Sequence, residues 1–215
     1  MLSIYQVPAL YRLLMGAGYG PDYAARYALV ADRIGEPDDI LEVCCGHLGL
    51  YRHLARRGLV RSYVGLEQAP AMLRLARRHG IDVRAFDVRA GGALPAAGTV
   101  IMQASLYQFH DLADALLPQL WAAARRRLVI AEPVRNLSQS RFAIARWAAR
   151  GLTRTADGRI HTFRYTEASL LECYRRCGVP VSRVDRTPGG REIVVSSLRA
   201  PGEAARPARL RAPSP

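Results

Sequence analysis

Short apolar runs alternate with longer segments of helical hydrophobic spacing along most of this chain. The apolar, β-forming runs occupy residues 40–44, 62–67, 81–87, 99–105 and 127–133. Helical spacing between them predicts a helix that ends near Gly58 and further helices over residues 69–78 and 112–125. Because strands and helices alternate, we expect parallel strands with helices on both faces of one sheet.

The N-terminal segment, residues 1–35, has helical spacing throughout, broken at residues 16–21 by a turn that contains Gly and Pro. It predicts a helical cap in two pieces, with Asp22 as a capping residue of the second helix. The cap is rich in tyrosine, with Tyr5, Tyr11, Tyr23 and Tyr27. These side chains either pack the cap on the core or point one or two hydroxyls into a ligand cavity.

The alternation stops after the fifth apolar run. Residues 134–165 are rich in arginine and contain one amphipathic helical pattern, so we expect an insertion that acts as a lid. Thr166 is placed to cap a further helix. Residues 181–184 and 192–198 flank a Pro-Gly turn and predict a closing β-hairpin.

Together these patterns predict an α/β fold of the Rossmann-like, doubly wound type. Its seven-stranded sheet should be mostly parallel, with an antiparallel closing strand. We expect one such domain over residues 36–199, preceded by the helical cap. The tail, residues 200–215, is mostly Pro, Ala and Arg with few apolar anchors, and is expected to be disordered.

Acidic residues accompany the first three predicted strands. Glu42 lies in the first strand, Glu67 closes the second and Asp87 closes the third. The carboxyl ends of parallel strands line one crevice, where ligands of such sheets bind. A carboxylate there can accept hydrogen bonds from the vicinal hydroxyls of a ribose, an exocyclic adenine amine, or the ammonium of an amino acid.

With these acids and the turn after the first strand, the chain resembles the class I S-adenosylmethionine-dependent methyltransferases over about residues 38–198. Glu42, Gly46, Glu67 and Asp87 fall at positions of that family's motifs, and residues 103–109 resemble the segment that covers the adenine and methionine moieties. The nearest type is the broad group of small-molecule enzymes that includes quinone-modifying methyltransferases. The resemblance implies S-adenosylmethionine as cofactor, bound by Glu42, Cys44, Gly46, Glu67, Gln68, Asp87, Val88, Gln103 and Ser105.

The turn itself departs from the family pattern. Cys44 stands where the first glycine is usual, Leu48 stands where the third is, and Gly49 comes one residue later. His47 occupies a position usually held by Thr or Ser. The same residues also match a dinucleotide-binding Gly-x-Gly-x-x-Gly motif that lacks its first glycine. Asp87 and the closing hairpin favour the methyltransferase over this alternative.

Methyl transfer from a sulfonium needs mainly alignment of the nucleophile in a dry pocket, so no general base is obligatory. The candidates at strand exits are Tyr107, His110 and Glu132. Tyr107 is expected to be a pocket wall and a hydrogen-bond donor. His110 is better explained as a loop residue without a role, and Glu132 either as a buried cap or as a substrate contact.

The cap and the insertion are expected to close the acceptor pocket, because the core of the fold leaves them free. The substrate-binding candidates are Tyr11, Tyr23, Arg135 and Asn136. Further insertion arginines, and Arg164, suit an anionic group on a small-molecule acceptor, although a solvated surface explains any single one of them as well.

The net charge of +13 raises the question of nucleic acid as a partner. All 31 basic residues are arginine, and they are spread along the chain rather than clustered, which argues against a nucleic-acid partner. No apolar run is long enough to span a membrane, and the N-terminus lacks the pattern of a secretory signal, so a cytoplasmic location is expected.

The four cysteines form the pairs Cys44–Cys45 and Cys173/Cys177. We expect reduced thiols and no metal site, because neither pair is completed by neighbouring ligands in the sequence. Three functions remain under consideration. The leading one transfers a methyl group to an O, N or C nucleophile of a small molecule by in-line displacement. The others are an RNA methyltransferase and a non-catalytic protein that keeps the cofactor fold as a binding module.

Overall fold

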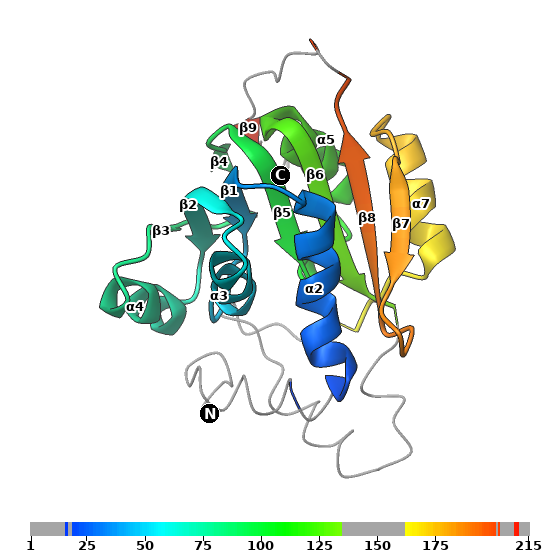
Figure 1. The fold of residues 1–215 in the computed structure, drawn as a ribbon. Helices are drawn as coiled ribbons and strands as arrows, with labels where there is room; N and C mark the ends of the chain where they lie inside the picture. The colour runs from blue at the N-terminus through cyan, green and yellow to red at the C-terminus, as the bar shows by residue number, and fades with distance from the viewer. Residues whose placement is uncertain (1–15, 17–18, 135–161, 201, 203–208, 211–215) are drawn as a thin grey trace.

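The computed structural model describes residues 16, 19–134, 162–200, 202 and 209–210. Its centre is a seven-stranded sheet in the order β3-β2-β1-β5-β6-β8-β7 (Figure 1). The strands are β1 Asp38–Val43, β2 Val60–Glu67, β3 Val83–Ala85, β5 Ala97–Gln103, β6 Ala124–Pro133, β7 Arg183–Arg186 and β8 Glu192–Leu198. Strands β1, β2, β3, β5 and β6 run parallel, whereas β8 pairs antiparallel with both β6 and β7. The predicted fold class is confirmed.

Helices cover both faces of the sheet. They are α2 Asp22–Ile34, α3 Gly49–Arg56, α4 Pro70–Arg78, α5 Ala113–Ala123 and α7 Glu167–Arg176, with a 3-10 turn, η2, at Leu106–Phe109. Helices α2 and α3 pack on one face and α5 and α7 on the other. The strands serve both layers because side chains alternate between faces: Ile101 packs with α2 and α3, and its neighbours Val100 and Met102 with α5.

The third strand is shorter than predicted. It covers only Val83–Ala85, because it is an edge strand that pairs with β2 alone. Asp87 therefore lies two residues beyond the strand. Thr166 caps α7 as the sequence predicts, with its Oγ1 accepting from the Ser169 N–H at 3.1 Å.

Asp22 does not cap α2, so that prediction is wrong. The N-cap is Pro21, without a side-chain cap. The buried Asp22 carboxylate instead accepts hydrogen bonds from Thr187 Oγ1 at 2.8 Å and from the Gly189 N–H at 2.8 Å, in the turn between β7 and β8. A Cβ on Gly189 would lie 2.6 Å from Asp22 Oδ2, so only glycine permits this approach.

Replacement of Asp22 by alanine is expected to lower the free energy of unfolding by about 2 kcal/mol, because buried turn donors lose their charged acceptor. Burial alone would raise the Asp22 pKa, but the hydrogen bonds from the turn outweigh it and lower that pKa. The contribution of the ionised Asp22 carboxylate to the free energy of unfolding is therefore present above the pKa of an unfolded Asp, about 3.9, and is lost as the pH falls below it. Urea unfolding at pH 7 and pH 3 checks both parts. An equal loss at the two pH values would contradict the ionic role.

Residues Arg209–Leu210 form a short strand, β9, that pairs antiparallel with β4, Gly92–Ala93. Composition does not predict this pairing. Most of the tail lies outside the described residues, as do the first helix of the cap and nearly all of the insertion, so the disorder and the lid expected there stay predictions. None of the described helices has the length and hydropathy needed to cross a membrane.

Candidate functional site

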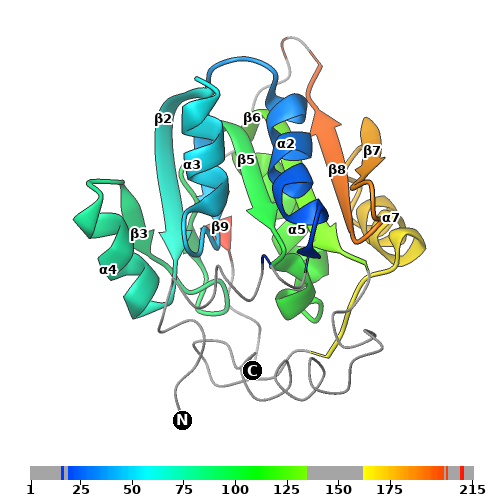
Figure 2. The same cartoon turned by 60° about the horizontal axis from the view of Figure 1, so that its bottom comes forward.

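A pocket opens at the carboxyl ends of β1, β2 and β5, and Figure 2 turns these strand ends towards the viewer. We call it the strand-end pocket. Eight of the nine predicted cofactor residues line it: Glu42, Cys44, Gly46, Glu67, Gln68, Val88, Gln103 and Ser105. The ninth, Asp87, is flanked by lining residues, but its own carboxylate accepts from the Arg89 N–H at 2.8 Å. The sequence therefore located the pocket, with one acid displaced from it.

The turn after β1 has an unusual backbone. Cys44, Gly46 and Leu48 have φ values of 61°, 54° and 63°, in the left-handed region that glycine adopts most readily. Cys44 and Leu48, the two non-glycine residues among them, thus hold a backbone conformation that is strained for a residue with a side chain. Gly49 has a separate reason to be glycine, since a Cβ there would lie 2.5 Å from the Tyr27 hydroxyl and 2.7 Å from His47 Nε2.

Glu67 ties this turn to the end of β2. Its Oε2 accepts from the Gly46 N–H, and its Oε1 accepts from the N–H groups of Gln68 and Ala69, each at 2.8 Å. Burial raises the Glu67 pKa, while these three donors lower it. The carboxylate is thus held in one orientation at the pocket, and its Oε2 keeps lone-pair capacity for a further donor.

Glu42 is a buried acid on the floor of the pocket. It is 3% exposed, and the Tyr63 hydroxyl donates to its Oε2 at 2.8 Å. Burial raises the Glu42 pKa to about 8, helped by the nearby Glu67, against the opposing effects of the Tyr63 hydrogen bond and Arg26. Such a group is neutral near pH 7 until a cation approaches it.

Arg26 is a charged pocket residue that sequence reasoning missed. It lies on α2, is 4% exposed, and its Nε lies 2.9 Å from Glu192 Oε2. Glu192 Oε1 in turn accepts from Gln103 Nε2 at 2.7 Å. The two partners come from β8 and β5, so no local pattern connects them. An arginine on the buried face of a helix is nevertheless a signal that could have marked it, because charged residues are rarely buried without a function or a partner.

Glu132 is a buried cap. It is fully buried, and its Oε1 accepts from the N–H groups of Ser105 and Leu106 at 2.9 and 2.8 Å, its Oε2 from that of Tyr107 at 3.2 Å. Burial raises its pKa to about 8, against these donors. Glu132 is not among the pocket-lining residues. Of the two roles that the sequence left open, the structure supports the cap.

Tyr107 and His110 lie beside the pocket rather than in its lining. The Tyr107 hydroxyl accepts from Gln108 Nε2 at 3.4 Å, and the Arg164 guanidinium lies 3.9 Å from the centre of the Tyr107 ring. His110 stacks on Phe163, with ring centroids 4.2 Å apart. Tyr107 and His110, which follow β5, thus form one aromatic and basic edge with Phe163 and Arg164. The structure shows neither Tyr107 nor His110 as a general base.

Two tyrosines of α2 approach the pocket from its other side. Tyr27 lines it, whereas the Tyr23 hydroxyl hydrogen bonds to Nε2 of the lining residue His47 at 3.1 Å. The remaining substrate candidates, Tyr11, Arg135 and Asn136, lie outside the described residues.

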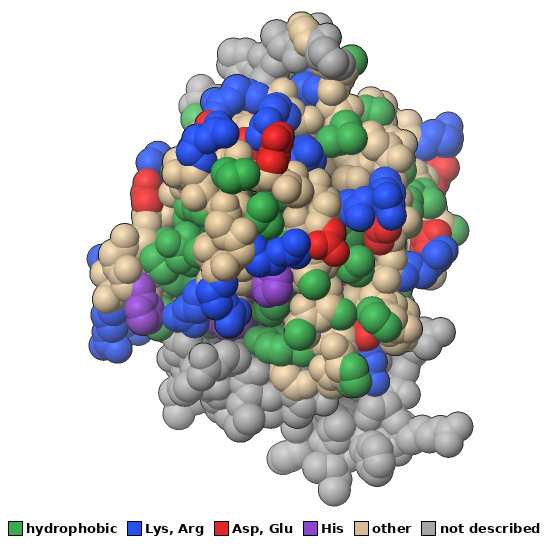
Figure 3. All heavy atoms as spheres, viewed as in Figure 1, with side chains coloured by type: hydrophobic (Ala, Val, Ile, Leu, Met, Phe, Trp, Pro, Cys, Tyr) green, Lys and Arg blue, Asp and Glu red, His purple; other side chains and the backbone are tan. Residues whose placement is uncertain are grey.

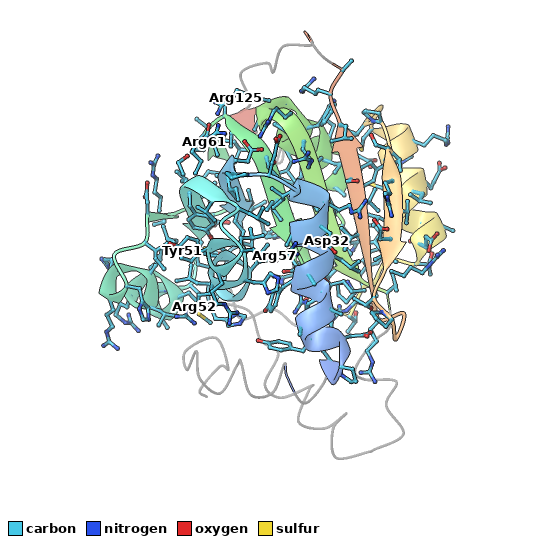
Figure 4. All side chains as sticks on the ribbon, in the orientation of Figure 1. Asp32, Tyr51, Arg52, Arg57, Arg61 and Arg125 are labelled. Carbon is cyan, nitrogen blue, oxygen red and sulfur yellow. The ribbon has the colours of Figure 1, made fainter. Side chains whose placement is uncertain are left out.

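The surface over α2 and α3 carries many arginines, but acids accompany them (Figure 3). Arg57 Nη1 lies 2.7 Å from Asp32 Oδ1, a pair visible in Figure 4, and Arg125 Nη2 lies 3.1 Å from Asp39 Oδ2. Arg126 pairs with both Glu36 and Asp38. On this face the positive charge is partly neutralised, which weakens attraction for a phosphate backbone.

No protein-family model and no curated protein sequence matches the chain, but many solved structures do. One is the magnesium protoporphyrin IX methyltransferase ChlM of Synechocystis PCC 6803 with bound SAH, at 18% identity and TM-score 0.61, covering 89% of this chain and 87% of that one. Another is DhpI in its complex with SAM and HEP, at 21% and 0.58, covering 92% and 97%. The 16S rRNA methyltransferase RmtF, with S-adenosyl-L-homocysteine, aligns at 17% and 0.58 over 86% of this chain and 64% of its own. The chain therefore has the fold of the class I methyltransferases.

Proposed function

We propose that the chain is an S-adenosylmethionine-dependent methyltransferase that acts on a small molecule. The observation that carries this proposal is the strand-end pocket of a methyltransferase fold. In this pocket the side chains of Glu42 and Glu67 lie beside the strained turn that follows β1. Solved neighbours of this fold include proteins with SAM or its demethylated product bound. They also include both small-molecule and RNA methyltransferases, so the acceptor class rests on other arguments.

The donor set of the pocket suits each part of S-adenosylmethionine. Oε2 of Glu67 would accept a hydrogen bond from a ribose hydroxyl, and Phe86, Val88 and Met72 supply apolar surface for the adenine. Glu42 and Arg26 offer opposite charges to the ammonium and carboxylate of the methionine moiety. The cofactor supplies an electrophilic methyl group on sulfur, so the chain's task is to hold the acceptor nucleophile in line and exclude water.

The acceptor is proposed to enter beside the edge formed by Tyr107, His110, Phe163 and Arg164. A guanidinium above an aromatic ring suits an anionic, partly apolar small molecule. The partly neutralised arginine surface gives no comparable support to an RNA acceptor.

Calorimetric titration of the full chain with S-adenosylmethionine tests the cofactor, and the absence of binding would overturn the whole proposal. Transfer of a labelled methyl group is then compared over metabolite pools and total RNA. We expect label in small molecules. Label in RNA, with affinity that falls steeply with salt, would instead establish the RNA enzyme, and binding without any transfer would establish a cofactor-binding module.

The affinity for S-adenosylmethionine is expected to rise about tenfold between pH 6 and pH 7. Because the Glu42 pKa is raised to about 8, the carboxyl must lose its proton to bind the ligand's ammonium, and that cost falls as the pH rises. The gain should level off near pH 8, where the ligand's amino group itself begins to lose its proton. Calorimetry across this range measures the slope. Glu42→Gln should remove it, and an unchanged slope in that variant would assign the titration to another group.

A further inference from the structure

Two thiols and one carboxylate converge on the opposite face of the sheet from the α2–α3 layer, where α5 meets α7. Cys173 lies on α7 and Cys177, one turn later, is its C-cap residue; each Sγ lies 3.8 Å from Asp114 Oδ1 in the first turn of α5. The three atoms all lie within 4.8 Å of one another. Cys173 is buried, Cys177 is half-buried and Asp114 is exposed, so the group is open to solvent on one side.

We propose that Asp114, Cys173 and Cys177 bind a zinc ion that joins α5 to α7. Zinc takes thiolate sulfur at about 2.3 Å and carboxylate oxygen at about 2.0–2.2 Å, so tetrahedral ligands lie about 3.3–3.8 Å apart. The observed separations already approach these values and need only small side-chain rotations. The solvent-facing side leaves the fourth position to water and gives the ion a path of entry.

Arg176 completes the charge balance. Its Nη2 lies 2.6 Å from Asp114 Oδ1. Two thiolates and one carboxylate carry three negative charges, which one zinc dication and one guanidinium neutralise. A carboxylate oxygen can bind a metal and still accept a hydrogen bond, and outer partners of this kind commonly orient metal-binding carboxylates. Arg176 is therefore a positioning residue rather than a competitor.

The sequence predicts no metal here because the site is assembled by the tertiary fold. Asp114 is 59 residues from Cys173, and the two thiols alone form an incomplete set. Burial raises the pKa of both thiols, that of Cys177 to about 12, so the free groups are protonated thiols that donate to Asp114. Zinc would displace two protons, and its affinity should therefore rise steeply with pH, by up to about a hundredfold per unit.

The test uses the full chain, reduced and handled without oxygen. Zn²⁺ is titrated against a chromogenic chelator, and Cd²⁺ serves as a spectroscopic probe through its thiolate charge-transfer band. We expect one ion per chain with submicromolar affinity. The melting temperature should rise by about 5 °C at a hundredfold excess over Kd, because the ion binds only the folded state.

Matched variants separate this site from other thiols. Cys177→Ser, at a half-buried position that tolerates a hydroxyl, and Asp114→Asn should each weaken zinc binding at least tenfold. Glu172→Gln is the control, since it removes an α7 carboxylate that pairs with Arg175 and should bind zinc as wild type does. Equal affinity in Cys177→Ser and wild type, which would point to Cys44–Cys45, overturns the proposal. So does a weak, nonstoichiometric uptake that the variants leave unchanged, which means an adventitious ion only.

Discussion

Replacement of Glu132 by alanine is expected to lower the free energy of unfolding by about 3–5 kcal/mol. The change leaves the N–H groups of Ser105, Leu106 and Tyr107 without their buried acceptors, and each such loss costs about 1–3 kcal/mol before the loop relaxes. The alanine also leaves a void at a fully buried position. Urea unfolding followed by circular dichroism measures the loss.

Glu132→Gln is the matched control, because it keeps one acceptor oxygen and most of the volume. It should cost clearly less, and the cost should depend on pH. The Glu132 pKa is raised from about 4.5 to about 8 in the folded protein, so the folded state holds a proton that the unfolded state releases. Wild-type stability from this group is therefore present at pH 4 and is lost as the pH rises towards 8, whereas the neutral Gln has no such slope. A cost that stays equal at pH 5 and pH 8 would contradict the raised pKa.

The parts of the site that the sequence predicts are those fixed by strand ends. Glu67 closes β2 and Glu42 lies one residue before the end of β1, and parallel pairing of β1 with β2 brings both to one crevice. The alternation of side chains along a strand and a turn made of small residues are local features, so a sequence shows them directly. Asp87 missed the pocket lining although Phe86 and Val88 on either side of it line the pocket, because its carboxylate accepts from the Arg89 N–H instead.

The parts that the sequence leaves open depend on contacts between distant residues. Asp22 has the residue type and position of a helix cap, yet its carboxylate accepts a hydrogen bond from a turn residue 165 positions away. Glu132 reaches amides 25 to 27 residues upstream, and Arg26 meets Glu192 across the α2–β8 contact. In each case a buried charged group pairs with the donors or acceptors that packing brings next to it, and packing is a property of the whole fold.

Glu67→Ala is expected to weaken binding of S-adenosylmethionine about a hundredfold. The proposed hydrogen bond from a ribose hydroxyl to this charged acceptor is worth about 1.5–3 kcal/mol. The variant also releases the Gly46 N–H from Oε2, so the strained turn loses the contact that ties it to the end of β2. Calorimetry of the wild type and the variant measures the change, with the melting temperature as a separate readout of folding.

Two controls make this result specific. Asp82→Ala removes an exposed carboxylate at the entrance of β3 that pairs with Arg84, and should leave the affinity within about twofold of wild type because it touches neither the turn nor the pocket. Glu67→Gln keeps one acceptor oxygen but loses the charge, so its affinity should fall between those of alanine and wild type. If Glu67→Ala bound the cofactor as tightly as wild type, Glu67 would be a structural tie for the turn alone, and the ribose would have to be held by other groups of the strand-end pocket.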